Sequence, residues 1–185
     1  MIERITAAEI AQMRANGYCP STITAAEAQL EICRRADELI ELIDRAFDGV
    51  TLDDGIGLRE SNGIDDYAGA DELKRLRALD EKLDWRKIPA ELLNYCNAAP
   101  SFLDAAGMRF HTPAILTSEL SGEYRSDFIG RLIYGSYSAT DFVQLLTTAQ
   151  CDAIVECIRF YGRIAPHIYG EDSIASAITR FRGTE

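Results

Sequence analysis

Along most of the chain, apolar residues recur every three or four positions, and short stretches rich in glycine and acidic residues separate these runs. The clearest run lies between Thr24 and Gly49 and contains Leu30, Cys33, Ala36, Ile40, Ile43 and Phe47. Such steps place side chains on one face of an α-helix, so the pattern predicts a long helix with one buried face. Its other face carries Glu31, Arg34, Arg35, Asp37, Glu38 and Glu41, which we expect to face solvent with local ion pairs.

Helix starts are marked by threonine followed three residues later by glutamate or glutamine, a pattern in which two side chains bind free backbone amides. The pattern occurs at Thr6, Thr24 and Thr147, and each predicts a helix. Turn residues and apolar spacing predict further helices over 58–67, 71–83, 89–97, 114–120 and 127–134, with a last helix capped by Asp172. Thr112 and Pro113 are expected to begin the helix over 114–120, which makes 102–110 a packed connection.

No stretch keeps the strict alternation that is typical of a strand. The sequence therefore predicts an all-α fold: one compact domain over residues 1–185, with about six to eight helices and ordered glycine-rich turns. Of the helix over 71–83, Leu73, Leu76 and Leu83 are expected to point inward. The predicted core contains Leu30, Ile40, Phe47, Leu76, Phe102, Phe110, Leu116, Ile154 and Ile158.

The chain has 185 residues and a formal net charge of −11, and residues 1–100 carry 20 acidic and 12 basic side chains. A field of this sign repels nucleic-acid phosphates and attracts basic proteins. It therefore disfavours nucleic-acid binding and suggests a basic protein partner, although the charge can also serve solubility alone. The residues expected to contact such a partner are Glu31, Glu38, Glu41, Asp53 and Asp54.

Other classes of site find little support. No apolar run approaches the roughly 18 residues that a membrane span needs, and the first residues lack the apolar core of a secretory signal, so we expect no membrane contact and a cytoplasmic location. Five cysteines without a Cys-x-x-Cys pair indicate free thiols, and neither a cofactor nor a metal site is predicted. The segment 135–139 lacks the final glycine of a nucleophile elbow.

The chain contains four distinctive motifs, which read Gly-Ile-Gly-Leu-Arg-Glu at 55–60, Ile-Asp-Asp-Tyr at 64–67, Asp-Glu-Lys-Leu-Asp-Trp at 80–85, and Gly-Met-Arg-Phe-His-Thr-Pro-Ala at 107–114. These motifs resemble those of an uncharacterised bacterial family of unknown function. The likeness spans roughly residues 24–160. It implies a small helical domain and no established activity.

Arg109, His111 and Arg59 are the strongest candidates for a polar centre, because Arg109 and His111 lie in a connection that is predicted to be packed, and a buried arginine needs a carboxylate partner. Asp65, Asp66 or a residue of 80–84 could supply it, either in a structural ion pair or in a catalytic site. Two functional classes stay open. The first is an acidic protein-binding module, comparable to an immunity protein or antitoxin that neutralises a basic partner. The second is a metal-assisted hydrolase of a small substrate that uses the acidic turns with Arg109 and His111.

Overall fold

The computed structural model describes residues 2–135 and 141–183, and over these ranges the chain forms nine α-helices, three short 3₁₀-helices and no strand. The all-α prediction is confirmed. Residues 136–139, which belong to the segment compared above with a nucleophile elbow, lie outside the described residues. The α-helices are α1 (Ala7–Ala15), α2 (Pro20–Ala46), α3 (Leu58–Asp65), α4 (Ala70–Ala78), α5 (Ala90–Tyr95), α6 (Ala105–Leu120), α7 (Phe128–Tyr134), α8 (Thr148–Ile164) and α9 (Glu171–Arg182). The 3₁₀-helices are η1 (Trp85–Lys87), η2 (Ala99–Ser101) and η3 (Phe142–Leu145).

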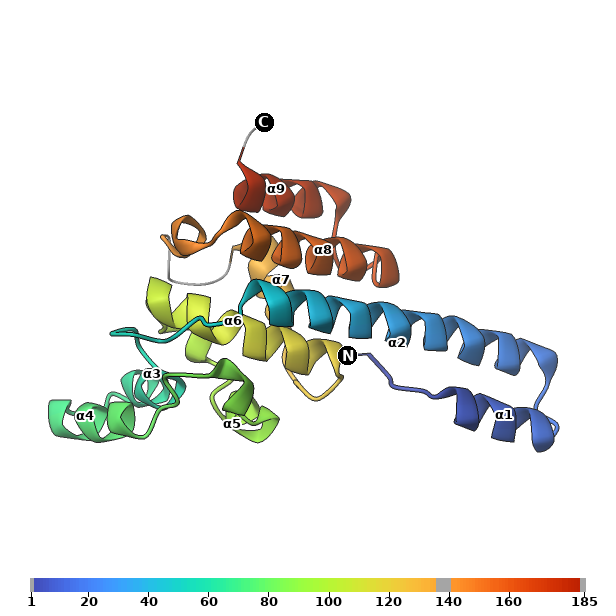
Figure 1. Cartoon of the computed structure of the whole chain (residues 1–185), viewed down its shortest axis with the longest axis horizontal. Helices are drawn as coiled ribbons and strands as arrows, with labels where there is room; N and C mark the ends of the chain where they lie inside the picture. The colour runs from blue at the N-terminus through green and yellow to red at the C-terminus, as the bar shows by residue number, and fades with distance from the viewer. Residues whose placement is uncertain (1, 136–140, 184–185) are drawn as a thin grey trace.

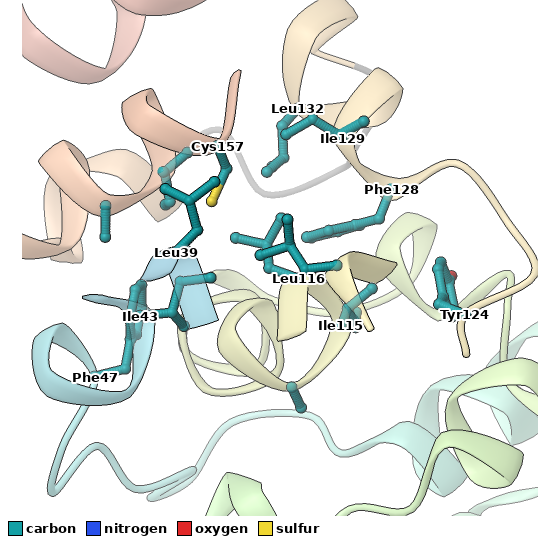
Figure 2. Packing of buried hydrophobic residues seen from close by; sticks show 14 of the residues in the cluster. Leu39, Ile43, Phe47, Ile115, Leu116, Tyr124, Phe128, Ile129, Leu132 and Cys157 are labelled. Atoms are coloured by element: carbon teal, nitrogen blue, oxygen red, sulfur yellow. The ribbon is translucent and has the colours of Figure 1, made fainter. Parts of the chain in front are cut away.

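The core lies where α2, α6, α7 and α8 meet. Figure 2 shows Leu39 and Ile43 of α2 close to Leu116 of α6 and Cys157 of α8, with Phe128 of α7 closing the cluster. Of the predicted core, Phe47, Phe110, Leu116, Ile154 and Ile158 are buried and Ile40 packs against the cluster. Leu30, Leu76 and Phe102 are only half-buried and lie outside it.

The first two helices form a hairpin in which α1 runs back along the N-terminal half of α2 (Figure 1). The predicted start of α1 is confirmed, because Thr6 Oγ1 accepts the Glu9 amide at 3.2 Å and Glu9 Oε2 accepts the Thr6 amide at 2.7 Å. The predicted start of the second helix at Thr24 is wrong. Pro20 occupies its first turn, where a fixed φ and a missing N–H cost nothing, so the helix nucleates earlier and Thr24 lies inside it.

Helix α6 passes straight through the predicted boundary at Thr112 and Pro113. It begins instead after Asp104, whose Oδ1 accepts the Gly107 amide at 2.7 Å, and Pro113 lies in its interior. A proline there removes one backbone hydrogen bond. Because 12 of the 16 residues of α6 are buried, tertiary packing holds the helix together across this defect. Residues 105–110 are therefore helix, where an irregular connection was predicted.

The predicted helix over 71–83 is also shorter than expected. It ends at Ala78, and Leu83 is 74% exposed although it was predicted to point inward. Glu81 Oε1 accepts the amides of residues 82–84 and holds the chain in a turn. Asp80 and Asp84 consequently share no helix face. The last helix starts at Glu171 with Gly170 as its cap, so the predicted cap Asp172 lies in its first turn.

The five cysteines are free, and Cys33, Cys96 and Cys157 are buried. This agrees with the prediction of free thiols. Within the described ranges, no helix combines the length and the apolar character needed to cross a bilayer.

Candidate interaction surface

Sequence motifs far apart in the chain meet where the loop before α3 crosses the first turn of α6. The Ile56 amide donates to Asp104 Oδ1 at 3.0 Å, and the same oxygen accepts the Gly107 amide. A Cβ atom on Gly107 would lie 2.4 Å from the Ile56 carbonyl oxygen. Only glycine therefore allows the two backbones to touch, and the motifs at 55–60 and 107–114 form one junction.

Asp80 adds the third motif to this junction. Its two carboxylate oxygens accept the backbone amides of Arg59 at 2.8 Å and of Glu60 at 3.2 Å, so Asp80 caps α3 from a distant loop. The residue at the N-cap position of α3 is Gly57, and its missing side chain makes room for the Asp80 carboxylate. A Cβ atom at this position would lie 2.2 Å from Asp80 Cγ. Burial raises the pKa of the Asp80 carboxyl, and the two amides oppose that shift.

His111 lies on α6 beneath this junction and is 1% exposed. Its Nδ1 lies 2.7 Å from the Gly107 carbonyl oxygen, which makes Nδ1 the protonated nitrogen of the neutral ring. Burial lowers the pKa of His111 to about 4, so the ring is uncharged near neutral pH. His111 lines a hollow of about 250 Å³ together with Arg59, Asp80 and Lys87.

The predicted ion pair of Arg109 is wrong. Arg109 is half-buried on α6 and forms no hydrogen bond or ion pair with any described residue, and its Nε is buried without a partner. The prediction failed because it placed Arg109 in a packed connection between helices, whereas Arg109 belongs to α6, which turns successive side chains by about 100°. Asp65 and Asp66 lie exposed at the end of α3, where Asp66 Oδ2 accepts a hydrogen bond from the side-chain Nδ2 of Asn62 at 2.9 Å. Within the described residues, no hydrogen bond or ion pair joins the four candidates to one another.

A different surface stands out at the end of the molecule formed by α3, α4 and α5 (Figure 1). Helix α4 buries none of its residues and packs mainly on α3. Between these helices lies a groove of about 380 Å³, here called the α3–α5 groove, lined by Arg59, Asn62, Gly63, Asp66, Ala68, Glu72, Arg75, Leu76, Tyr95 and Cys96. Tyr95 is 73% exposed and also borders a second hollow of about 710 Å³ beside Glu91 and Arg125, so its ring forms a ridge between the two.

Tyr67 is the most exposed large apolar side chain among the described residues, at 96%. It follows the end of α3 with φ of +57°, and the amides of Tyr67 and Ala68 bond to the carbonyls of Ile64 at 3.1 Å and Gly63 at 2.8 Å. These two bonds define the helix-ending motif in which glycine usually occupies the left-handed position. The left-handed conformation costs a residue other than glycine roughly 1–2 kcal/mol. The exposed Tyr67 therefore lowers the stability of the fold relative to glycine at this position.

The predicted acidic face on α2 is exposed, and its charges are locally compensated. Glu31, Glu38 and Glu41 are 74%, 63% and 74% exposed, and each forms an ion pair with an arginine three or four residues away on the same helix. By contrast, no ion pair within the described residues involves the exposed carboxylates Asp53, Asp54, Asp65, Asp66 and Asp71. Part of the uncompensated negative charge therefore lies in the loop before α3 and around the ends of α3 and α4.

The acidic residues do not form a metal site in the part of the chain that the structure describes, where no three Asp, Glu, His or Cys side chains are arranged to hold an ion. Asp80, Glu81 and Asp84 instead bind backbone amides of the same region.

Sequence reasoning missed Tyr67 and Tyr95. Tyr67 follows α3 and Tyr95 ends α5, and each lies three positions after an apolar residue, so the local spacing does not separate an exposed aromatic ring from a buried one. A tyrosine in place of the usual glycine after α3 was the one available signal.

Comparison with known families decides what the chain is related to. Residues 35–181 match the model of a family of unknown function, DUF6714. The chain belongs to this family. The DUF6714 match includes the motif junction and the α3–α5 groove, and it begins within α2, so α1 and the first part of α2 precede it. No curated protein and no solved structure gives a significant match to the chain.

Proposed function

We propose that this DUF6714 protein is a protein-binding module that captures a basic, arginine-bearing segment of a partner in the α3–α5 groove. The observation that carries the proposal is the coincidence of two features on one face: exposed tyrosines, and carboxylates that form no ion pair with any described residue. Tyrosine and arginine are the side chains most enriched at the energetic centres of protein interfaces.

The chemistry of the face suits a guanidinium group. A guanidinium group is planar, so it can donate two parallel hydrogen bonds to one carboxylate, and it can also stack on an aromatic ring. Asp66 lines the groove and Tyr95 forms its rim, with Tyr67 next to Asp66 in the chain. An arginine could therefore meet a carboxylate and a tyrosine ring together, and Asp65 and Asp71 would steer it in from solution.

The biological role that fits best is neutralisation of a basic protein, as an immunity protein or antitoxin neutralises its target. A negative net charge of −11 favours fast association with such a partner. The cytoplasm is the compartment we propose, since free thiols suit a reducing environment. The alternative of a metal-assisted hydrolase gains no specific support, because Asp80, Glu81 and Asp84 bind backbone amides and no three described Asp, Glu, His or Cys side chains are arranged to hold an ion.

Selection from a random peptide library displayed on phage tests the proposal with a defined ligand source. We expect the selected peptides to be rich in arginine and to shift amide resonances of residues 59–96. The double variant Asp66→Asn with Tyr95→Ala should lower the affinity for a selected peptide by at least about tenfold. This is the size expected for losing a charged hydrogen bond and an aromatic contact.

A matched control compares the two acidic faces. Glu31→Lys, Glu38→Lys and Glu41→Lys together reverse three charges on α2 without touching the groove. If the groove is the site, these changes lower the association rate modestly through the long-range field and leave the dissociation rate unchanged. Selected peptides without basic residues, or binding lost only in the α2 variant, would refute the proposal.

A further inference from the structure

On the far side of the core from the α3–α5 groove, the structure contains a cavity that the proposed function does not use. It has a volume of about 460 Å³ and lies among α2, the end of α6, the start of α7 and the end of α8. We call it the Tyr161 cavity; its described lining is Ile2, Glu3, Gln29, Ile32, Glu119, Ser126, Asp127, Tyr161, Ile164, Ala165, Ile168 and Tyr169.

Tyr161 gives the cavity its first unusual property. The side chain is only 5% exposed, and its hydroxyl is buried without a hydrogen-bond partner among the described residues. A buried polar group in this state costs about 1–3 kcal/mol, and such groups are rare in folded proteins. The neighbouring Tyr169 differs, because its hydroxyl donates to Asp127 at 2.8 Å. The cavity therefore presents one unsatisfied phenol.

The charge of the lining is the second property. Three carboxylates, Glu3, Glu119 and Asp127, line the cavity, and its described lining contains no basic side chain. Glu119 is 5% exposed and accepts the Ile129 amide at 3.1 Å. Burial, with a contribution from the charge of Asp127, raises the pKa of Glu119 to about 8. Near neutral pH this buried carboxyl therefore keeps its proton in the folded chain.

We propose that the Tyr161 cavity binds a protonated organic amine with a small apolar body. The ammonium group would donate to the unpartnered Tyr161 hydroxyl and to Glu119, and the rings of Tyr161 and Tyr169 add cation–π attraction. The apolar body would lie against Ile32 and Ile164 on the cavity wall. A neutral molecule would leave the carboxylates uncompensated, and an anion would be repelled by them.

Isothermal titration calorimetry with three matched probes tests this assignment on the full chain. Phenethylamine, 2-phenylethanol and phenylacetate share a ring and differ in charge, and we expect measurable binding of the amine alone. At pH 7 a carboxyl with a pKa near 8 is about 90% protonated, so binding should release about 0.9 proton per amine when Glu119 ionises. Titrations in two buffers of different ionisation enthalpy measure that release.

Two variants locate the site. Tyr161→Phe removes only the unpartnered oxygen and should lower the affinity for phenethylamine by about tenfold. Glu119→Gln should lower this affinity and also abolish the proton release. Tyr95→Phe removes a hydroxyl from a tyrosine of α5, outside the cavity lining, and should leave binding unchanged. If Glu119→Gln fails to fold, Tyr161→Phe alone decides. The proposal is overturned by equal affinity for 2-phenylethanol, by binding that Tyr161→Phe does not change, or by no binding at millimolar amine.

Discussion

Replacing Gly107 by alanine is the sharpest test of how the motif junction is built. Gly107 lies in the first turn of α6, and the added Cβ would meet the Ile56 carbonyl oxygen at 2.4 Å, about 1 Å closer than an ordinary contact. Both atoms in conflict are fixed to backbone. Relief therefore requires α6 and the loop before α3 to separate, which stretches the bond from the Ile56 amide to Asp104.

The size of the effect follows from three contributions. Overpacking a tight contact costs about 1–3 kcal/mol, and weakening a hydrogen bond to a carboxylate costs up to about 1.5–3 kcal/mol. Alanine recovers about 0.5–1 kcal/mol of helix propensity relative to glycine. We expect a net loss of about 2–4 kcal/mol in the free energy of unfolding. For a chain of this length, the melting temperature should fall by about 4–16 °C.

Urea unfolding followed by tryptophan fluorescence measures this change close to the junction. The single tryptophan, Trp85, is 4% exposed and donates its indole N–H to the Phe47 carbonyl at 3.0 Å. Gly162→Ala is the matched control, because the same substitution inside α8 meets only the flexible Cδ1 of Ile174 at 2.6 Å. It should change stability by less than about 1 kcal/mol. Equal stability of the two variants would show that the glycine contact does not hold the junction.

Four further outcomes are expected. Tyr67→Gly should raise the free energy of unfolding by about 1 kcal/mol, because glycine adopts the left-handed conformation freely, and urea unfolding measures it. Cys19 should react fastest of the five thiols with iodoacetamide, with a pH midpoint near 7, because hydrogen bonds from Ser21 and Thr22 lower its pKa to about 7; peptide mapping identifies the site. His111 stays neutral when folded but takes up a proton when unfolded, so its contribution to stability should fall as pH drops from about 6.5 to 4; His111→Gln should flatten that part of the curve. Glu119 has the opposite sign: its folded pKa is raised, so stability should fall as pH rises from about 4.5 to 8, and Glu119→Gln should remove this slope.

The sequence by itself determined the features that depend on neighbours within a few positions. The reciprocal caps at Thr6 and Thr147 form as predicted, because both partners belong to one turn. The stop at Gly135 also follows from local geometry, since φ is +69° there. The all-α class and the buried stripe of α2 follow from apolar spacing in the same way, because periodicity alone fixes which residues share a helix face.

Only the tertiary structure decided the features that join distant segments. Pro113 remains inside α6 because burial on nearly every side outweighs one missing hydrogen bond, and no local signal reports that burial. Asp80 was expected to extend a helix, yet its carboxylate caps α3, a contact across 20 residues. Arg109 forms no ion pair with a described residue, and Tyr67 projects into solvent, because the packing around them settles which polar or apolar side chains find partners. The local pattern predicts where most helices form, whereas the bounds of α6 and the site depend on long-range contacts whose energies exceed the local preferences.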